Sequence, residues 1–165
     1  MSYLAPIEEM KFLLKDLFKI SSISSGKQKI DIDAQTIDII LEEVRKLSEK
    51  IIAPINRDSD LFPAIFENGI VVLPQSFSKA YDAIAEGGWI GISGNKKYGG
   101  MGLPFFMTSC VNEILSSGCL SLALNPLMTQ GQIEALECHG SEKIKNLFLP
   151  KLNSGEWSGT MNLTE

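Results

Sequence analysis

A change of hydrophobic period near residue 156 constrains the fold of this chain more than any other feature. From residue 7 to about residue 155, apolar residues recur three or four positions apart, which is the spacing of amphipathic helices. From Trp157 to Thr164 they alternate with polar residues, as in a β-strand. A lone strand cannot satisfy its own backbone donors and acceptors. The sequence therefore predicts a mainly α-helical domain that ends in the first strand of a β-rich region continuing beyond Glu165.

Capping residues, prolines and glycines divide the helical part. Asp33, Ser76 and Ser141 are predicted N-caps, and Pro54 should kink or interrupt its helix near Ala53. The predicted helices cover residues 7–19, 33–53, 76–87, 104–117, 121–140 and 141–155, the fourth of them nearly uncharged and hence buried and central. Between them, residues 21–29 are predicted to be a mobile connection, and residues 58–74 a loop with a short extended piece at 70–73. We expect three parts: an extension (1–30), a helical domain (31–155) and the start of a β domain (156–165).

Composition excludes several classes of function. The chain is 44% hydrophobic and 21% charged, as soluble globular proteins are. Its net charge of −5 and the lack of a Lys/Arg cluster argue against nucleic-acid binding. No apolar run reaches the roughly 20 residues of a membrane span, and no signal peptide is recognisable, so we expect a cytoplasmic protein.

The three cysteines, Cys110, Cys119 and Cys138, form no CxxC pair, and their odd number favours reduced, buried thiols. His139 follows Cys138, which raises the possibility of a catalytic dyad or a metal site. Neighbours on a helix point about 100° apart, and one histidine with one thiol is too few ligands for structural zinc. We therefore expect no metal site.

Glycine is concentrated in GGWIGISGNKKYGGMGLP, residues 87–104, which indicates a loop whose shape depends on close backbone approach. This loop resembles the Gly-Trp and Tyr-Gly-Gly-x-Gly motifs of the acyl-CoA dehydrogenases. The run GQIEALECHGSEKIKNLFLPKLNSGEWSGTMNLTE is similar to that family's order of Gly-Ser/Thr-x-x-Gln/Glu-Lys, Leu-Pro-x-Leu, Gly-Glu and a strand ending in Thr-Glu. The opening MSYLAPIEEMKFLL resembles the extension of a larger subgroup that includes methylmercaptopropionyl-CoA dehydrogenase-like enzymes.

The resemblance implies a fold and a site. The family fold is an N-terminal helical domain, a β-barrel domain and a C-terminal four-helix bundle, of which this chain matches the first. Met161, Leu163 and Thr164 correspond to the strand that contacts the flavin ring of FAD, the alternative being an ordinary β-strand. Met128, Thr129 and Gly131 correspond to helix positions that line the acyl pocket, the alternative being plain core packing.

The resemblance also implies a reaction. In the family a carboxylate removes the α proton of an acyl-CoA while a hydride passes from the β carbon to the flavin. That base belongs to the C-terminal domain, so Glu165 is not it and this chain holds no catalytic residue. The chain alone is therefore expected to be inactive. An electron acceptor such as electron-transfer flavoprotein and a homo-oligomeric parent are implied as well. The alternative function is a free-standing helical module that binds a partner protein through an apolar face.

Overall fold

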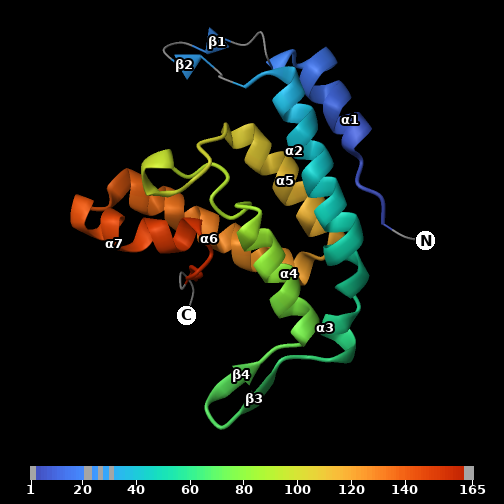
Figure 1. Cartoon of the computed structure of the whole chain (residues 1–165), viewed down its shortest axis with the longest axis vertical. Helices are drawn as coiled ribbons and strands as arrows, with labels where there is room; N and C mark the ends of the chain where they lie inside the picture. The colour runs from blue at the N-terminus through green and yellow to red at the C-terminus, as the bar shows by residue number, and fades with distance from the viewer. Residues whose placement is uncertain (1–2, 21–23, 26–27, 30–31, 162–165) are drawn as a thin grey trace.

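The computed structural model describes residues 3–20, 24–25, 28–29 and 32–161. Helices make up most of the described chain, which confirms the mainly helical class (Figure 1). The α-helices are α1 (Ile7–Phe12), α2 (Ala34–Leu47), α3 (Asp58–Leu61), α4 (Gln75–Glu86), α5 (Phe105–Gly118), α6 (Leu120–His139) and α7 (Glu142–Asn153). Two hairpins interrupt them, β1 (Ser24–Ser25) with β2 (Gln28–Lys29), and β3 (Ile65–Glu67) with β4 (Ile70–Val72).

The first helical region continues beyond α1 as a π-helical turn, η1 (Leu13–Leu17), so that the predicted helix 7–19 is present in two forms. Ile7, Met10 and Leu14 of this region are buried and belong to the main core. The carboxylate of Asp38 on α2 pairs with Lys15, and Lys11 lies 3.6 Å from Glu42. Packing and charge together hold the N-terminal helix along α2.

Helix α2 begins as its sequence predicts, and the helical region that it opens is interrupted further along. The Asp33 carboxylate accepts the Thr36 N–H at 2.7 Å, which is the expected N-cap bond. After Leu47 the chain changes to a π-turn, η3 (Ser48–Ile52), and then to a 3-10 turn, η4 (Ala53–Ile55). Pro54 cannot donate a helical hydrogen bond, so the predicted interruption near Ala53 is confirmed.

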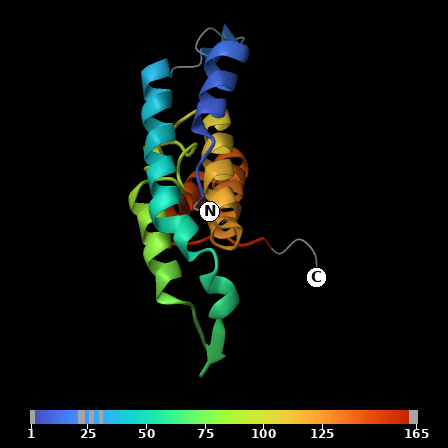
Figure 2. The ribbon, with the colours of Figure 1, turned by 90° about the vertical axis from the view of Figure 1, so that its right-hand side faces the viewer.

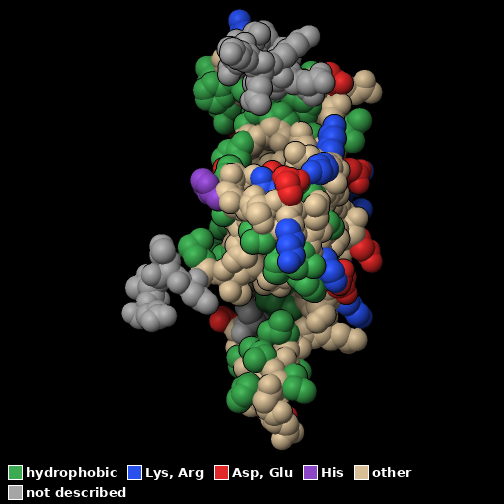
Figure 3. Space-filling model, turned by 90° about the vertical axis from the view of Figure 1, so that its left-hand side faces the viewer, with side chains coloured by type: hydrophobic (Ala, Val, Ile, Leu, Met, Phe, Trp, Pro, Cys, Tyr) green, Lys and Arg blue, Asp and Glu red, His purple; other side chains and the backbone are tan. Residues whose placement is uncertain are grey.

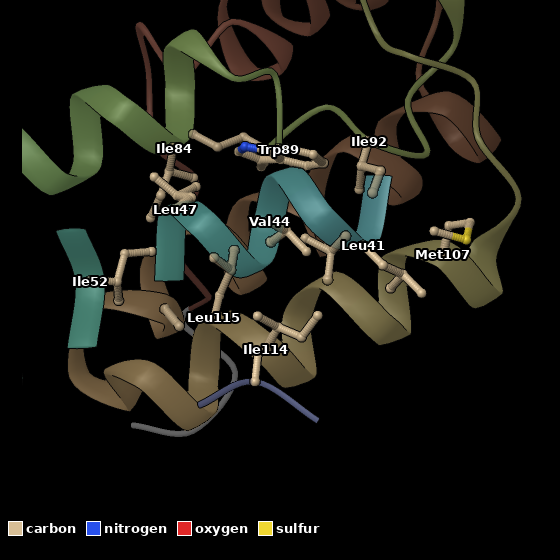
Figure 4. Packing of buried hydrophobic residues seen from close by; sticks show 14 of the residues in the cluster. Leu41, Val44, Leu47, Ile52, Ile84, Trp89, Ile92, Met107, Ile114 and Leu115 are labelled. Carbon is tan, nitrogen blue, oxygen red and sulfur yellow. The ribbon is translucent and has the colours of Figure 1, made fainter. Parts of the chain in front are cut away.

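The core lies between α2 and α5, which run side by side (Figures 1 and 2). Leu41 and Val44 of α2 face Ile114 and Leu115 of α5, with Trp89 closing one side (Figure 4). Each such aliphatic side chain, when fully buried, contributes about 1.5–3 kcal/mol relative to exposure. Helix α5 is therefore the central helix that its lack of charge predicts.

A close approach fixes the far end of α5. A Cβ on Gly118 would lie 2.4 Å from the Ser48 hydroxyl oxygen of η3, so only glycine fits at this position. The same hydroxyl donates to the Ile114 carbonyl oxygen at 3.0 Å. The buried serine thus has a partner, and the π-turn of η3 rests directly on α5.

Residues 58–74 differ from the prediction. They form the short helix α3 and the β3–β4 hairpin, in which Phe66 pairs with Val71, rather than a loop with one extended piece. Asn68 and Gly69 have φ angles of 51° and 79°, the left-handed pair that a two-residue hairpin turn requires. The hairpin projects away from the helices (Figure 1), and its hydrophobic side chains form the lower tip of the surface in Figure 3.

Two smaller predictions need correction. Ser76 is not the N-cap of α4: Pro74, with φ −54° and a non-helical ψ of 137°, holds the N-cap position, and the helix begins at Gln75. Cys138 is exposed on the last turn of α6, whereas Cys119 is buried and Cys110 is half-buried as expected. Gly87 ends α4 and the Ser141 hydroxyl accepts the Ile144 N–H, both as predicted.

The glycine-rich loop folds back on itself. Three backbone N–H groups on its second arm donate to carbonyl oxygens on its first: Met101 to Gly91, Gly102 to Gly94 and Leu103 to Ile92, each at 2.9 Å. Its floor is the carboxamide of Asn153, which is buried on α7 and donates to the Tyr98 carbonyl oxygen at 3.0 Å. The loop is a packed element, as its glycine content indicates.

After α7, Gly155 turns the chain with φ +77°. Residues 157–161 form neither helix nor paired strand, and the remainder of the predicted strand, residues 162–164, lies outside the described residues. The Tyr81 hydroxyl donates to the Gly155 carbonyl oxygen at 2.9 Å, which ties this turn to α4. Burial raises the pKa of Tyr81, so the hydroxyl keeps its proton for this bond.

Candidate functional site

Helix α6 carries most of the predicted site residues. It runs for 20 residues from Leu120 to His139, and its assignment continues through Pro126. The proline is buried and sits in the second turn, where it removes one helical N–H without ending the helix. One uninterrupted helix therefore carries both the apolar stripe and the residues that hold the C-terminal segment.

One side of α6 is an exposed apolar stripe. Leu120, Leu124, Leu127, Met128 and Gly131 follow helical spacing, and Leu124 is 46% exposed. A Cβ on Gly131 would meet nothing within 4 Å. Leucines on a helix usually face a core, so this stripe is a surface suited to an apolar ligand or another domain.

A different side of α6, next to the stripe, holds the C-terminal segment. The buried Thr129 hydroxyl donates to the Asn125 carbonyl oxygen and accepts the Gly159 N–H, each at 3.0 Å. One turn further, the Gln132 carboxamide donates to the Thr160 carbonyl oxygen. A Cβ on Gly159 would lie 2.7 Å from Gln132, so glycine allows the segment to lie flat on the helix.

The structure separates the three predicted acyl-pocket residues. Met128, which is half-buried, and Gly131, which is exposed, share the stripe because they are three positions apart. Thr129 lies on the buried side and holds Gly159. Of the predicted flavin-contacting residues, Met161 is 60% exposed beyond the tethered segment, while Leu163 and Thr164 lie outside the described residues.

Sequence reasoning missed the residues that position the site. Gln130 is buried: its carboxamide oxygen accepts from Asn112 on α5 at 2.7 Å, and its N–H₂ donates to the Trp89 carbonyl oxygen at 3.2 Å. Gln132 and Gly159 were missed too. A polar residue on the buried side of an apolar helix is the signal that points to Gln130, because such a group needs partners.

A hydrogen bond to α6 and an ion pair to α7 hold the glycine-rich loop in place. The Glu137 carboxylate on α6 accepts the Asn95 N–H at 2.7 Å, and Lys97 lies 2.9 Å from Glu142 at the start of α7. The hydrogen bond from Lys97 lowers the pKa of Glu142. The pKa of Lys97 is raised, first by its hydrogen bond with the Tyr98 hydroxyl and then by Glu142.

Within the described residues, His, Cys, Asp and Glu form no group of three or more that is able to hold a metal ion. His139 is exposed at the end of α6. In the same part of the chain, every helix is too short or too polar to cross a membrane.

Comparison with known proteins gives the class that this fold and helix define. Residues 35–156 match the model of the acyl-CoA dehydrogenase N-terminal domain, and the chain belongs to the acyl-CoA dehydrogenase family. It is 38% identical over 165 residues to 3-methylmercaptopropionyl-CoA dehydrogenase of Ruegeria pomeroyi, covering all of this chain. It is 30% identical over 170 residues to a butyryl-CoA dehydrogenase of Syntrophomonas wolfei, covering 99% of this chain.

A broad-specificity linear acyl-CoA dehydrogenase of Mycobacterium tuberculosis is 26% identical over 99% of this chain. The chain spans 28% of the length of the Ruegeria relative and 27% of the other two. The predicted family is therefore confirmed, and the 3-methylmercaptopropionyl relative agrees with the subgroup that the first residues resemble. The match corresponds to one part of a longer type of enzyme.

Proposed function

We propose that this chain is the N-terminal helical domain of an FAD-dependent acyl-CoA dehydrogenase, an oxidoreductase that forms an α,β double bond in an acyl-CoA thioester. The observation that carries the proposal is the double role of α6. One side of this helix presents the stripe that contains Met128 and Gly131, and a different side fixes Gly159 and Thr160. The surface expected to bind the acyl chain and the segment expected to meet the flavin are thus held by one rigid element.

The last described residues, 159–161, have a shape and chemistry that suit the edge of a flavin ring. An extended backbone with small side chains suits an isoalloxazine edge. Gly159 and Thr160 lie outside the helices and are tethered to α6, and Met161 is exposed next to them. When bound, FAD supplies hydride acceptance. Met161, Leu163 and Thr164 are the residues of this chain that we assign to its ring.

For the substrate, we assign Met128 and Gly131 to the acyl pocket. Methionine adapts to irregular apolar shapes, and glycine permits a chain to approach the helix backbone. Thr129 serves the site indirectly, as the residue that holds Gly159. The catalytic carboxylate is supplied from outside this chain, so the 165 residues alone should show neither dehydrogenase activity nor tight FAD binding.

Further parts of the proposal concern the whole enzyme. It passes electrons to an acceptor such as electron-transfer flavoprotein, assembles as a homo-oligomer and is located in the cytoplasm. The three-part division into residues 1–30, 31–155 and 156–165 belongs to the same proposal. Cell fractionation, sedimentation and acceptor assays test these points separately.

The deciding experiment uses the full-length protein. We expect it to purify with the visible absorption of a flavin, and that absorption should bleach when an acyl-CoA is added without oxygen. A protein that lacks flavin, or a flavin that stays oxidised with acyl-CoAs of every chain length tried, contradicts the proposal. A stoichiometric yellow complex with residues 1–165 alone would contradict the expected inactivity of the isolated domain.

Thr129→Val tests the positioning role of α6. The change keeps the side-chain shape but leaves the Gly159 N–H without its acceptor, so FAD should bind the apoenzyme roughly tenfold more weakly, about the effect of one buried hydrogen bond. Thr108→Val is the matched control, because Thr108 is also a buried threonine but lies on α5. Equal FAD affinity in both variants would show that the tether does not serve the flavin.

The second candidate is a helical module that binds a partner protein. The exposed apolar side chains of the β3–β4 hairpin favour it, since both strands are exposed at every position. The flavin measurement separates the two candidates, because a pure binding module would carry no flavin as a full-length protein.

A further inference from the structure

A small pocket adjoins the apolar stripe and extends from the acyl surface assigned above towards α5. It measures about 180 Å³ and lies between α5 and α6, where Leu127 and Gly131 belong to both the stripe and the pocket wall. Phe105 of α5 forms another apolar part of the wall. Because one water molecule in liquid occupies roughly 30 Å³, this space accepts about six non-hydrogen atoms.

The floor of the pocket is polar and buried. Thr108 is 3% exposed and Gln130 is 9% exposed, and both line the pocket together with Asn112. The hydrogen bonds from Asn112 to Gln130 and from Gln130 to Trp89 hold the two carboxamides in place. The floor is therefore preorganised.

One group on this floor lacks a partner. The Thr108 hydroxyl oxygen is buried and has no hydrogen-bond partner among the described residues. Leaving a buried hydroxyl unpaired is unfavourable, and such groups in native proteins usually serve a water molecule or a ligand. Thr108 lines the same pocket as Gly131.

The charges around the pocket select a neutral ligand. Among its lining residues no lysine or arginine is present, and Glu134 lies at the rim. A carboxylate or phosphate would meet Glu134 without a compensating cation. The fitting group is thus small, uncharged and able to accept a hydrogen bond.

Resting on the proposed function, we infer that this pocket receives the far end of the acyl group and favours acyl chains that carry a neutral oxygen acceptor, such as an ether, hydroxyl or carbonyl, beyond the β carbon. Leu127 and Gly131 form the passage from the stripe, and the Thr108 hydroxyl donates to the oxygen. A thioether sulfur, which is a weak acceptor, occupies the same place with less preference. A plain methylene leaves the hydroxyl unpaired.

The test compares acyl-CoAs of equal length in which one methylene, at successive positions from the γ carbon outward, is replaced by sulfur or by oxygen. With the full-length flavoenzyme, we expect kcat/KM for the best-placed oxygen to exceed that for the methylene chain by about tenfold, with sulfur between them. Thr108→Val should remove this preference, so that oxygen and methylene chains of equal length react with equal kcat/KM in the variant, because valine offers no donor to the oxygen.

Gly131→Ala is a second variant, which narrows the passage without strain in the helix. It should lower kcat/KM for chains long enough to reach the pocket and leave the shortest acyl-CoA less affected. Equal kcat/KM for oxygen and methylene chains at every position would overturn the inference, and it is the result expected of a pocket that holds only water. A preference for oxygen that survives in Thr108→Val would also overturn it. If methylene chains reduce the flavin, the proposed function stands in either case; if no acyl-CoA does, both fail.

Discussion

The β3–β4 hairpin and the glycine-rich loop both depend on glycine, but the hairpin is exposed and the loop is packed. Both are short non-helical segments that place glycine at positive φ, Gly69 in the hairpin and Gly88, Gly99 and Gly102 in the loop. In the hairpin Phe66 is 73% exposed, whereas Trp89, Ile92 and Tyr98 of the loop are buried. Glycine content alone therefore does not decide whether a segment is mobile. Whether it is fixed depends on the bonds it makes to distant residues.

Those bonds differ in kind. The described strands of the hairpin pair with each other, which a two-residue turn can specify locally. The loop depends on Asn153, Glu137 and Glu142, which are 42 or more residues away in the sequence. The difference predicts that mutations in the loop change the stability of the whole domain, while those in the hairpin act locally.

Gly100→Ala should have the largest effect. A Cβ at this position would lie 2.1 Å from the carbonyl oxygen of Gly94, and neither backbone can move without breaking the bonds between the two arms of the loop. We expect the free energy of unfolding to fall by about 3 kcal/mol, which is the upper range for overpacking a packed site. Urea unfolding of the domain measures it. A loss below about 0.5 kcal/mol, as at ordinary surface sites, would mean that the loop is not packed as described.

Asn153→Ala should cost less, about 2 kcal/mol, because it leaves the buried Tyr98 carbonyl oxygen unpaired and removes part of the floor under the loop. Asn146→Ala on the exposed side of the same helix is the control and should stay within about 0.5 kcal/mol of the wild type. Equal effects in the two variants would contradict the role of Asn153.

Gly69→Ala should cost about 1 kcal/mol and only within the hairpin. The new Cβ meets nothing within 4 Å, but alanine at φ +79° is strained. Amide exchange should rise in β3 and β4 while α5 keeps its protection. Loss of protection in α5 as well would show that the hairpin is coupled to the core, which would erase the contrast with the loop.

The smallest effect concerns pH. Since Lys97 lowers the folded-state pKa of Glu142, the pair stabilises the fold above the unfolded pKa of about 4.3 and loses this contribution as the pH falls through the lower folded value. Lys97→Met should therefore lower the melting temperature slightly at pH 7 and flatten its decrease in acid. Lys46→Met, which removes a pair within α2, is the control for the loss of a surface charge.

Local signals in the sequence were sufficient for most helix boundaries. The Asp33 and Ser141 caps and the interruption at Pro54 depend on neighbouring residues alone. The Asn68–Gly69 turn is equally local, but the pattern of apolar residues beside it predicts one extended piece, whereas the structure has two paired strands. The prediction of Ser76 as an N-cap was wrong, because the N-cap position falls two residues earlier, at Pro74.

The site was less accessible from sequence. The resemblance located α6, and helical geometry explains why Thr129 faces away from Met128 and Gly131, since adjacent residues lie about 100° apart. Local pattern could not show that Thr129 holds Gly159, 30 residues later, or that Gln130 bridges α5 and Trp89. Such pairs exist only after the helices have packed, so they depend on tertiary structure.

The continuity of α6 has a consequence for how enzymes of this type can diverge. A helix of 20 residues is about 30 Å long, and its rise per residue is set by backbone hydrogen bonds rather than by its side chains. On the proposed function, changes among the stripe residues alter which chain is accepted but do not alter the distance from that chain to the tethered segment at Gly159. Substrate range can then change while reaction geometry stays the same, because the helix keeps a constant distance between the two sites.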